Sequence, residues 1–230
     1  MLSPSISTVM VRVTCRTDEL HTGHPVRRLL AELERSGTVD RIDLSRLDRR
    51  ATSALIAGVL GRSGSAAFVG EVFERSDGNP FHVEELIEAQ LCGETLPPRL
   101  RDLLLARVEL LPVPAQRVLR AASVVPGPVD PDLLDVLAAG AGIGTRTLRG
   151  ALEEAVDRHL LVTDPAGERY LFRHALVREA VYRGLLPGQR ARLHAAAATA
   201  LEQRHRDACD PRVLGEVAYH WHAAGDGPRA

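Results

Sequence analysis

The chain of 230 residues contains no lysine, and all 29 of its basic residues are arginine. A complete P-loop needs a lysine side chain to reach the β- and γ-phosphates of a nucleotide. Schiff-base catalysis needs a lysine amine as its nucleophile. These 230 residues therefore cannot supply either kind of chemistry by themselves.

Aromatic residues are also scarce, at 3% of the chain. Proteins that bind single-stranded nucleic acid stack its bases on aromatic side chains, so this mode of binding is disfavoured. The formal net charge is −1, which gives no overall electrostatic attraction to DNA or to a membrane surface. Hydrophobic residues at 45% and charged residues at 26% are typical of a globular protein with a packed core.

The cysteines are few and far apart, at Cys15, Cys92 and Cys209. Because no two of them are spaced as CxxC, a zinc ribbon and a redox dithiol are both unsupported. Free thiols of a cytoplasmic protein are the simplest account. No apolar run approaches the roughly 18 residues of a membrane span, and the N-terminus lacks the regions of a signal peptide. We expect a cytoplasmic protein with no membrane partner.

The first 47 residues have the pattern of a small α/β unit. Residues 8–15 are β-branched and apolar, which is typical of a buried strand. An amphipathic helix is predicted over residues 25–36, and a second short strand over residues 39–44. Two strands do not make a stable sheet. We therefore expect this unit to depend on further residues upstream or on the rest of the chain.

From residue 48 onward the hydrophobic pattern is helical. Three helices are predicted first, over residues 55–60, over residues 68–73 and from Pro80 onward. The third helix begins at a tight turn. Gly78 can adopt a positive φ without steric cost, Asn79 is a favourable N-cap, and Pro80 suits the first helical turn. These helices predict a small helical subdomain.

The second half of the chain is predicted to be helical with one β-hairpin. The expected helices cover residues 100–111, 115–125, 133–138, 148–156, 175–186, 189–203 and 211–221. The hairpin is expected between residues 160–163 and 169–172, around a turn rich in proline and glycine. Helices followed by a hairpin are typical of a winged helix. The last small-residue helices are typical of the start of a tetratricopeptide (TPR)-like array.

Six segments, in this order along the chain, resemble the central region of large ATP-binding transcriptional regulators of the LuxR type. These regulators belong to the STAND class of signal-transduction ATPases, which is related to the AAA ATPases. The matching segments are Val13–Leu20, His24–Leu30, Gly78–Leu86, Phe172–Tyr182, Leu185–His194 and Ala218–Trp221. Each motif alone has low specificity, whereas the ordered set covers nearly the whole chain.

The resemblance implies a mainly α fold with a small α/β remnant. The implied domains are the C-terminal part of a P-loop ATPase core (1–47), a helical lid (48–94), a winged-helix domain (95–173) and the start of a TPR-like array (174–230). The family's P-loop, Mg²⁺-binding acidic strand and DNA-binding helix-turn-helix have no counterpart in this sequence. We therefore expect a central fragment that relays the ATP or ADP state between the ATPase core and the sensor repeats.

Three nucleotide-binding positions follow from the resemblance, and no catalytic or metal-binding residue does. Arg16 resembles the sensor arginine that faces the terminal phosphate, which a guanidinium can bind through two hydrogen bonds. Pro80 resembles the lid proline that packs on the adenine. His174 resembles the winged-helix histidine that contacts the β-phosphate of ADP. The implied cofactor is ATP or ADP, and the implied partner is the missing ATPase half or a second copy of the chain.

Each of these positions also has a purely structural interpretation. Arg16 is close enough in sequence to pair with Asp18 or Glu19, and Pro80 simply begins a helix well. His174 can cap the helix that starts at the next residue or bond to Glu179.

Two other functions remain open from the sequence. The segment 173–206 carries seven arginines against two glutamates, a balance of +5, so a stand-alone winged-helix module that binds DNA or protein is an alternative. We expect this face to pack against nucleotide or neighbouring domains, and direct DNA binding by this chain is not expected. A non-functional product of a truncated gene is a further alternative. Without a P-loop lysine, the chain is not expected to be an enzyme.

Overall fold

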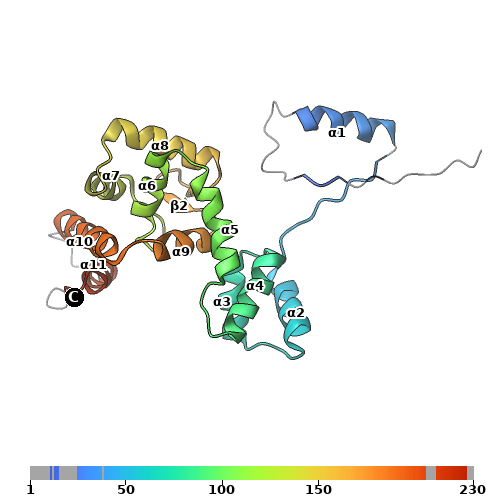
Figure 1. Ribbon diagram of the computed structural model, residues 1–230, viewed down its shortest axis with the longest axis horizontal. Coiled ribbons are helices and arrows are strands. Elements are labelled where there is room, and N and C mark those ends of the chain that lie inside the picture. Colours follow the sequence, from blue (N-terminus) through green and yellow to red (C-terminus); the bar gives the residue numbers. More distant parts are fainter. Residues whose placement is uncertain (1–10, 12, 16–24, 38, 206–210, 227–230) are drawn as a thin grey trace, which may run out of the picture. The chain divides into compact units, whose positions relative to one another are not determined.

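The computed structural model of the protein describes residues 11, 13–15, 25–37, 39–205 and 211–226. The chain divides into two units, residues 1–45 and residues 46–230, which are described separately. The described residues form eleven α-helices and one two-stranded antiparallel sheet (Figure 1).

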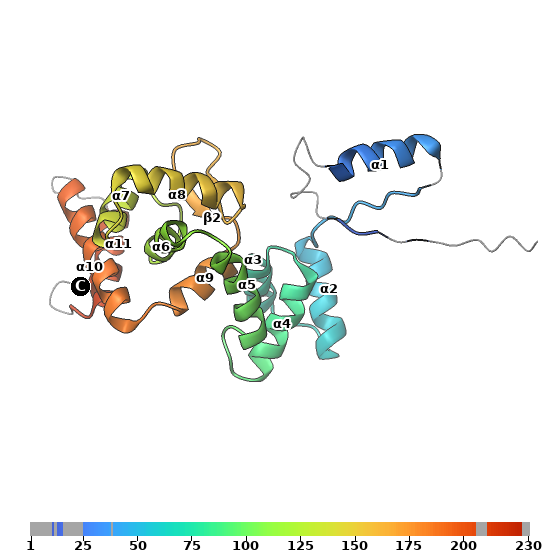
Figure 2. The same ribbon diagram turned by 45° about the horizontal axis from the view of Figure 1, so that its top comes forward.

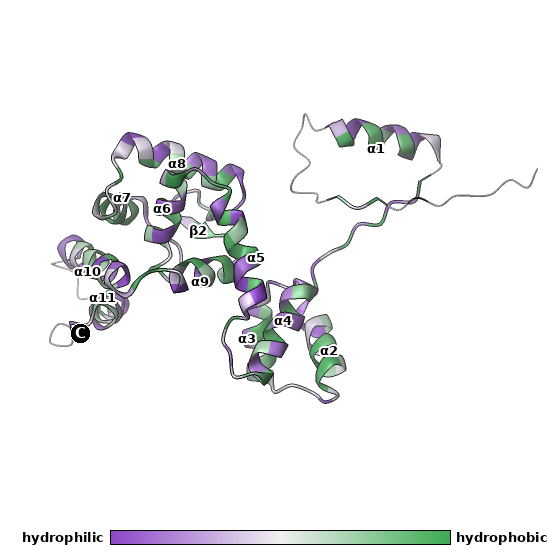
Figure 3. Ribbon diagram, viewed as in Figure 1, coloured by the Kyte–Doolittle hydropathy of each residue, from purple (hydrophilic) through white to green (hydrophobic). Residues whose placement is uncertain are grey.

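The first unit contains one helix, α1 (Pro25–Ser36), with the bounds predicted from its periodicity. Hydrophilic and hydrophobic residues alternate along α1 (Figure 3), yet none of its residues is buried. The strand predicted over residues 39–44 is wrong, because these residues are irregular and largely exposed. Residues 11 and 13–15 of the other predicted strand are also irregular, and its remaining residues lie outside the described part. A strand needs a hydrogen-bonded neighbour, which neither segment has among the described residues of this unit.

The second unit begins with three packed helices, α2 (Arg49–Leu60), α3 (Ala66–Ser76) and α4 (Pro80–Leu91). Each has a side-chain N-cap that accepts a hydrogen bond from an otherwise unpaired backbone N–H: Asp48 for α2, Ser65 for α3 and Asn79 for α4. Fully buried aliphatic side chains from α2 and α4 fill the space between them. The three helices predicted in this part of the chain are therefore present.

The next part contains four helices and the hairpin. The helices are α5 (Pro98–Glu109), α6 (Val113–Ala122), α7 (Pro131–Gly140) and α8 (Thr145–Asp157). Strands β1 (Leu161–Thr163) and β2 (Tyr170–Phe172) pair antiparallel, with Leu161 opposite Phe172. An isolated bridge between Val129 and Tyr170 adds a third segment beside β2. The predicted hairpin is confirmed, and it follows three helices that pack on one another.

The last three helices are α9 (Ala175–Arg183), α10 (Pro187–Arg204) and α11 (Pro211–Ala224). Helix α9 packs against α3 and α5 and also against α6 and β2, so it connects the two groups of helices (Figure 2). Helix α10 packs against α7 and α11. Buried hydrophobic residues from α2 through α11 form one continuous core cluster within this unit.

Candidate functional site

The turn before α4 is held tightly against the segment that precedes α2. Gly78 has φ = +67°, and the backbone N–H of Leu47 donates a 2.8 Å hydrogen bond to its carbonyl oxygen. A Cβ atom on Gly78 would overlap the carbonyl oxygen of Leu47. The side chain of Asn79 accepts a hydrogen bond from the N–H of Phe81 at 3.1 Å, and Pro80 is the first residue of the helix. The predicted turn is therefore confirmed, and it requires glycine for two separate reasons.

Asp77 connects this turn to two distant parts of the chain. It ends α3 in the left-handed conformation, with φ = +53°. Its Oδ2 forms an ion pair with Arg46 and also lies 3.2 Å from Nδ1 of His174. His174 immediately precedes α9, so its side chain fixes the start of α9 beside the turn that begins α4.

The ring of His174 is largely buried and neutral at pH 7. Burial, and then the nearby cations Arg46 and Arg173, lower its pKa to about 4. The contact with Asp77 is therefore a hydrogen bond from a neutral ring, which places the proton on Nδ1, rather than an ion pair. The side chain makes no capping hydrogen bond to α9. His174 therefore occupies the N-cap position of α9, but its side chain bonds to Asp77 rather than to the helix N-terminus or to Glu179.

Glu179 serves a different contact, between α9 and α3. Nη2 of Arg75 on α3 lies 3.0 Å from Oε2 and 3.2 Å from Oε1 of Glu179, and it also donates to the carbonyl of Thr95. Nε of Arg183 donates to Glu179 from one helical turn away at 3.1 Å. The Arg75 and Glu179 side chains are both mostly buried. A partly desolvated, charge-assisted hydrogen bond of this kind holds two elements in a defined geometry.

Replacing Glu179 by glutamine is expected to lower the free energy of unfolding by about 1–3 kcal/mol. The substitution keeps the shape of the side chain but leaves the mostly buried Arg75 guanidinium with only the more exposed Glu71, at 3.3 Å, as its counter-charge. Urea denaturation of the wild-type protein and of Glu179→Gln measures the difference in unfolding free energy.

The matched control for this substitution is Glu154→Gln. Glu154 pairs with Arg158 across one turn of α8 at 3.0 Å, in a more exposed position. An exposed pair of this kind contributes about 0.5 kcal/mol or less. Equal losses in the two variants would show that the Arg75–Glu179 pair is an ordinary surface contact.

His82, in the first turns of α4, is a further buried polar group near the same corner. It is 7% exposed, and its Nδ1 makes no hydrogen bond within the part of the chain that the structure describes. Burial lowers its pKa, with smaller contributions from Arg46 and Arg107, while the backbone of Ser76 opposes the shift. A positive charge on His82 would also lower the pKa of His174. The corner therefore gathers two neutral imidazoles beside one carboxylate and its arginine.

A second buried cluster lies where α9, α10 and α11 meet. Nδ1 of His194 lies 2.8 Å from Nδ1 of His220, and Nε2 of His194 lies 3.0 Å from the hydroxyl of Tyr182. Burial lowers the pKa of both histidines to about 4, with Arg190 adding to the effect on His194. One ring must donate and the other accept in the Nδ1–Nδ1 contact, so the two rings cannot both be protonated there.

The three positions assigned by resemblance have different outcomes. Arg16 lies outside the described residues. Pro80 starts α4, and His174 contacts Asp77, three residues before Pro80. Sequence reasoning missed Arg46, Asp77 and His82, because only the tertiary fold brings them to this corner.

The described residues contain no group of three or more His, Cys, Asp or Glu side chains placed to hold a metal ion. Among these residues, no helix has both the length and the apolar character needed to cross a membrane.

Comparison with known proteins gives one similar structure. No protein-family model matches the chain, and no curated protein matches it. Among solved structures, it is similar to a Signal Transduction ATPase with Numerous Domains (STAND) protein with a tetratricopeptide repeat sensor from Pyrococcus horikoshii. The identity is 14%, the TM-score is 0.44, and the match covers 81% of this chain and 26% of that chain. This chain thus spans about a quarter of that protein's length, and a likeness of this degree does not extend that protein's activity to it.

Proposed function

We propose that the chain is the central, nucleotide-responsive part of a STAND-type regulator of the LuxR type. In this role, residues 48–94 act as the lid, residues 95–173 as a winged helix, and residues 174–230 as the start of the sensor repeats. The support is the ordered set of six motifs, together with the arrangement of three helices, a hairpin and a bridging third segment at Val129. Adenine nucleotide is the proposed ligand.

The contact between His174 and Asp77 is the observation that carries this proposal. It joins the residue immediately before the motif that contains Pro80 to the motif that contains His174, although the two bonded residues are 97 positions apart. In the proposed complex, Pro80 packs on the adenine and His174 contacts the β-phosphate of ADP. Arg16 would face the terminal phosphate when ATP is bound.

The chemistry of His174 suits a phosphate ligand. The carboxylate of Asp77 accepts a hydrogen bond from Nδ1–H and thereby fixes the ring. This leaves Nε2 as the nitrogen that can take up a second proton. A phosphate oxygen near Nε2 would favour the protonated ring, because an adjacent negative charge raises the pKa of a histidine. ADP binding is therefore expected to raise the pKa of His174 from its value of about 4.

The proposed switch has two states. With ADP bound, the contacts of α9 with α3 and with the α4 turn hold the lid and winged helix together. With ATP bound, these contacts open. The population of the open state then rises by an amount set by the difference in ATP affinity between the open and closed states. Helix α9 is suited to this role because it packs on α3, α5, α6 and β2. The chain itself would not hydrolyse ATP, because it has no P-loop lysine.

The proposal also requires a partner for the first unit. Several large hydrophobic side chains in this unit are highly exposed, namely Val11, Val13, Ile42 and Leu44. Exposed apolar residues in one segment indicate a surface that another element covers. We propose that these residues pack in an α/β ATPase core that also carries the phosphate loop, supplied by a further segment or by another chain.

DNA binding by the arginine-rich segment 173–206 is less well supported. Arg178 donates to the carbonyl of Ser123, Arg183 pairs with Glu179, and Arg204 pairs with Asp130. Arg190 stacks on the ring of Tyr182. Arginines that are already engaged within the protein are poorly placed to neutralise phosphates of DNA.

Titration of the protein with ADP, followed through the imidazole NMR signals of its histidines, tests the proposed function. We expect weak binding, with a Kd of about 1 mM, because the chain supplies only part of the pocket. The signals of His174 and His82 should shift, and Pro80→Ala should weaken the binding. His222→Gln, which changes an exposed histidine on α11, should leave binding unchanged. Shifts confined to other histidines would contradict the assignment.

A further inference from the structure

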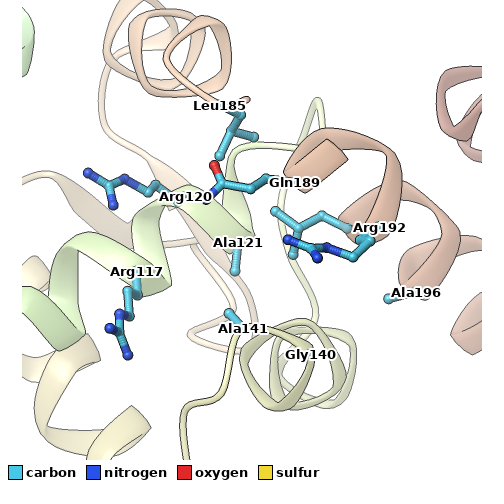
Figure 4. A pocket seen from close by; sticks show the side chains of 10 residues that line it. Arg117, Arg120, Ala121, Gly140, Ala141, Leu185, Gln189, Arg192 and Ala196 are labelled. Atoms are coloured by element: carbon cyan, nitrogen blue, oxygen red, sulfur yellow. The ribbon is translucent and has the colours of Figure 1, made fainter. Parts of the chain in front are cut away.

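A cavity of about 430 Å³ lies between α6 and α7 on one side and α10 with the segment before it on the other, and none of its lining residues belongs to the His174 corner. Arg117, Arg120 and Ala121 of α6 line one side, and the end of α7 contributes Gly140 and Ala141. The opposite wall comes from Leu185 and from Gln189, Arg192, Leu193 and Ala196 of α10. Figure 4 shows the side chain of Arg192 extending toward Ala121, whereas the side chains of Arg117 and Arg120 point away from Arg192. This volume is within the range of small-molecule sites.

The lining of the cavity is positively charged, and its three arginines are also exposed to solvent. Its lining includes three arginines and no aspartate or glutamate. Within the part of the chain that the structure describes, none of the three arginines has an ion pair or a side-chain hydrogen bond. This differs from Arg204, farther along α10, which pairs with Asp130. Two like charges one turn apart on α6 repel each other, and a bound anion would relieve that repulsion.

The remaining lining is small and apolar. Ala121 is fully buried, and Leu185 and Leu193 are almost fully buried, so the floor of the cavity is hydrocarbon. The N-terminus of α10 begins at Pro187, close to Gln189, and its dipole adds to the positive potential. Guanidinium groups bind carboxylate and phosphate oxygens through paired hydrogen bonds.

From this combination we infer that the cavity binds a small organic anion, with a phosphate or carboxylate group against the arginines and an apolar body against the alanines and leucines. The bound anion would link α6 to α10 and so hold the hairpin-containing part against the last helices. The site shares no residue with the proposed nucleotide corner, so it does not rest on the proposed function.

Titration of the full chain with 1-naphthyl phosphate, followed by calorimetry, tests this inference. This probe carries both an anionic group and an apolar body. We expect it to bind with a Kd below about 1 mM and at least tenfold more tightly than either inorganic phosphate or 1-naphthol. 1-Naphthoate should also bind, and all anionic binding should weaken as salt is added. Equal binding of 1-naphthol or of inorganic phosphate would overturn the proposal, as would no binding of either naphthyl anion.

Variants locate the binding to this cavity. Binding of 1-naphthyl phosphate should weaken about tenfold or more in Arg192→Gln and in the double variant Arg117→Gln/Arg120→Gln, because each variant removes charged donors. Arg192→Lys keeps the charge and should retain intermediate affinity. Arg149→Gln removes an equal charge from α8, which does not line the cavity, and should change the affinity less than twofold. Circular dichroism checks that each variant is folded. A loss in Arg149→Gln equal to that in Arg192→Gln would overturn the proposal.

Discussion

Replacing Gly78 by alanine is expected to lower the free energy of unfolding of the second unit by more than about 3 kcal/mol. An L-residue at φ = +67° costs about 1–2 kcal/mol by itself. The added Cβ would also overlap the carbonyl oxygen of Leu47. That oxygen belongs to the backbone, so the overlap can be relieved only if the segment before α2 moves away. Such a movement breaks the Leu47–Gly78 hydrogen bond and disturbs the Arg46–Asp77 pair.

Gly61 offers a matched control for this substitution. It has the same φ of +67° at the end of α2, but a Cβ there would meet nothing within 4 Å. Gly61→Ala is therefore expected to cost only the conformational penalty, about 1–2 kcal/mol. Urea denaturation followed by circular dichroism measures both variants. If Gly78→Ala and Gly61→Ala lower the free energy of unfolding equally, the close packing of the turn against Leu47 does not restrict the residue at position 78.

Acidification from pH 6.5 to pH 4 is expected to destabilise the folded protein strongly through the buried His194–His220 pair. Both histidines have a folded-state pKa of about 4, compared with 6.5 for an ordinary histidine. Between these pH values the unfolded chain binds protons that the folded chain does not, so the free energy of unfolding falls as the pH falls. Each proton excluded by the folded state corresponds to about 3 kcal/mol over this window. Above pH 6.5 the effect disappears, because the rings are neutral in both states.

The surroundings of the pair explain why it resists protonation. Tyr182 of α9 and Tyr219 of α11 face His194, and Arg190 of α10 adds a positive charge nearby. Glu202 of α10 accepts a hydrogen bond from the indole N–H of Trp221 at 2.7 Å. Among the described residues, the hydrogen bonds of the two imidazoles join them to each other and to Tyr182 rather than to a carboxylate, so a protonated ring would lack a counter-charge.

Unfolding free energies measured from pH 7 to pH 4 test this prediction. His220→Gln should show a shallower loss of stability than the wild type, even where its stability at pH 7 is lower, because one titrating group is gone. His222→Gln changes an exposed ring two residues away and should keep the wild-type slope. An unchanged slope in His220→Gln would assign the acid sensitivity to other groups.

Local chemistry was sufficient to predict most helices, although α7 begins at Pro131 rather than at residue 133 as predicted. Asn79 with Pro80 begins α4 where the sequence predicted it, because N-caps and first-turn prolines act through neighbouring backbone atoms. The hairpin around residues 164–167 also formed as predicted. The strand predicted over residues 39–44 did not form, since a strand depends on hydrogen bonds from a neighbour that local sequence cannot provide.

The candidate site was only partly predictable. His174 was identified by resemblance, but its partner Asp77 lies 97 residues away, and no local pattern connects the two. The His194–His220 pair and the three arginines of the cavity likewise come from different helices. These groups meet because of helix packing, which depends on the whole core rather than on the spacing of the residues concerned.

The pKa of His174, measured by NMR in the absence and presence of ADP, tests the central claim most directly. Without nucleotide, the ring should titrate near pH 4 because it is buried beside Arg46 and Arg173. With several millimolar ADP, we expect its pKa to rise by at least one unit, while adenosine, which lacks phosphate, should leave it unchanged. An unchanged pKa for His174 at saturating ADP would contradict the account, and so would an ADP response confined to residues around the arginine-lined cavity.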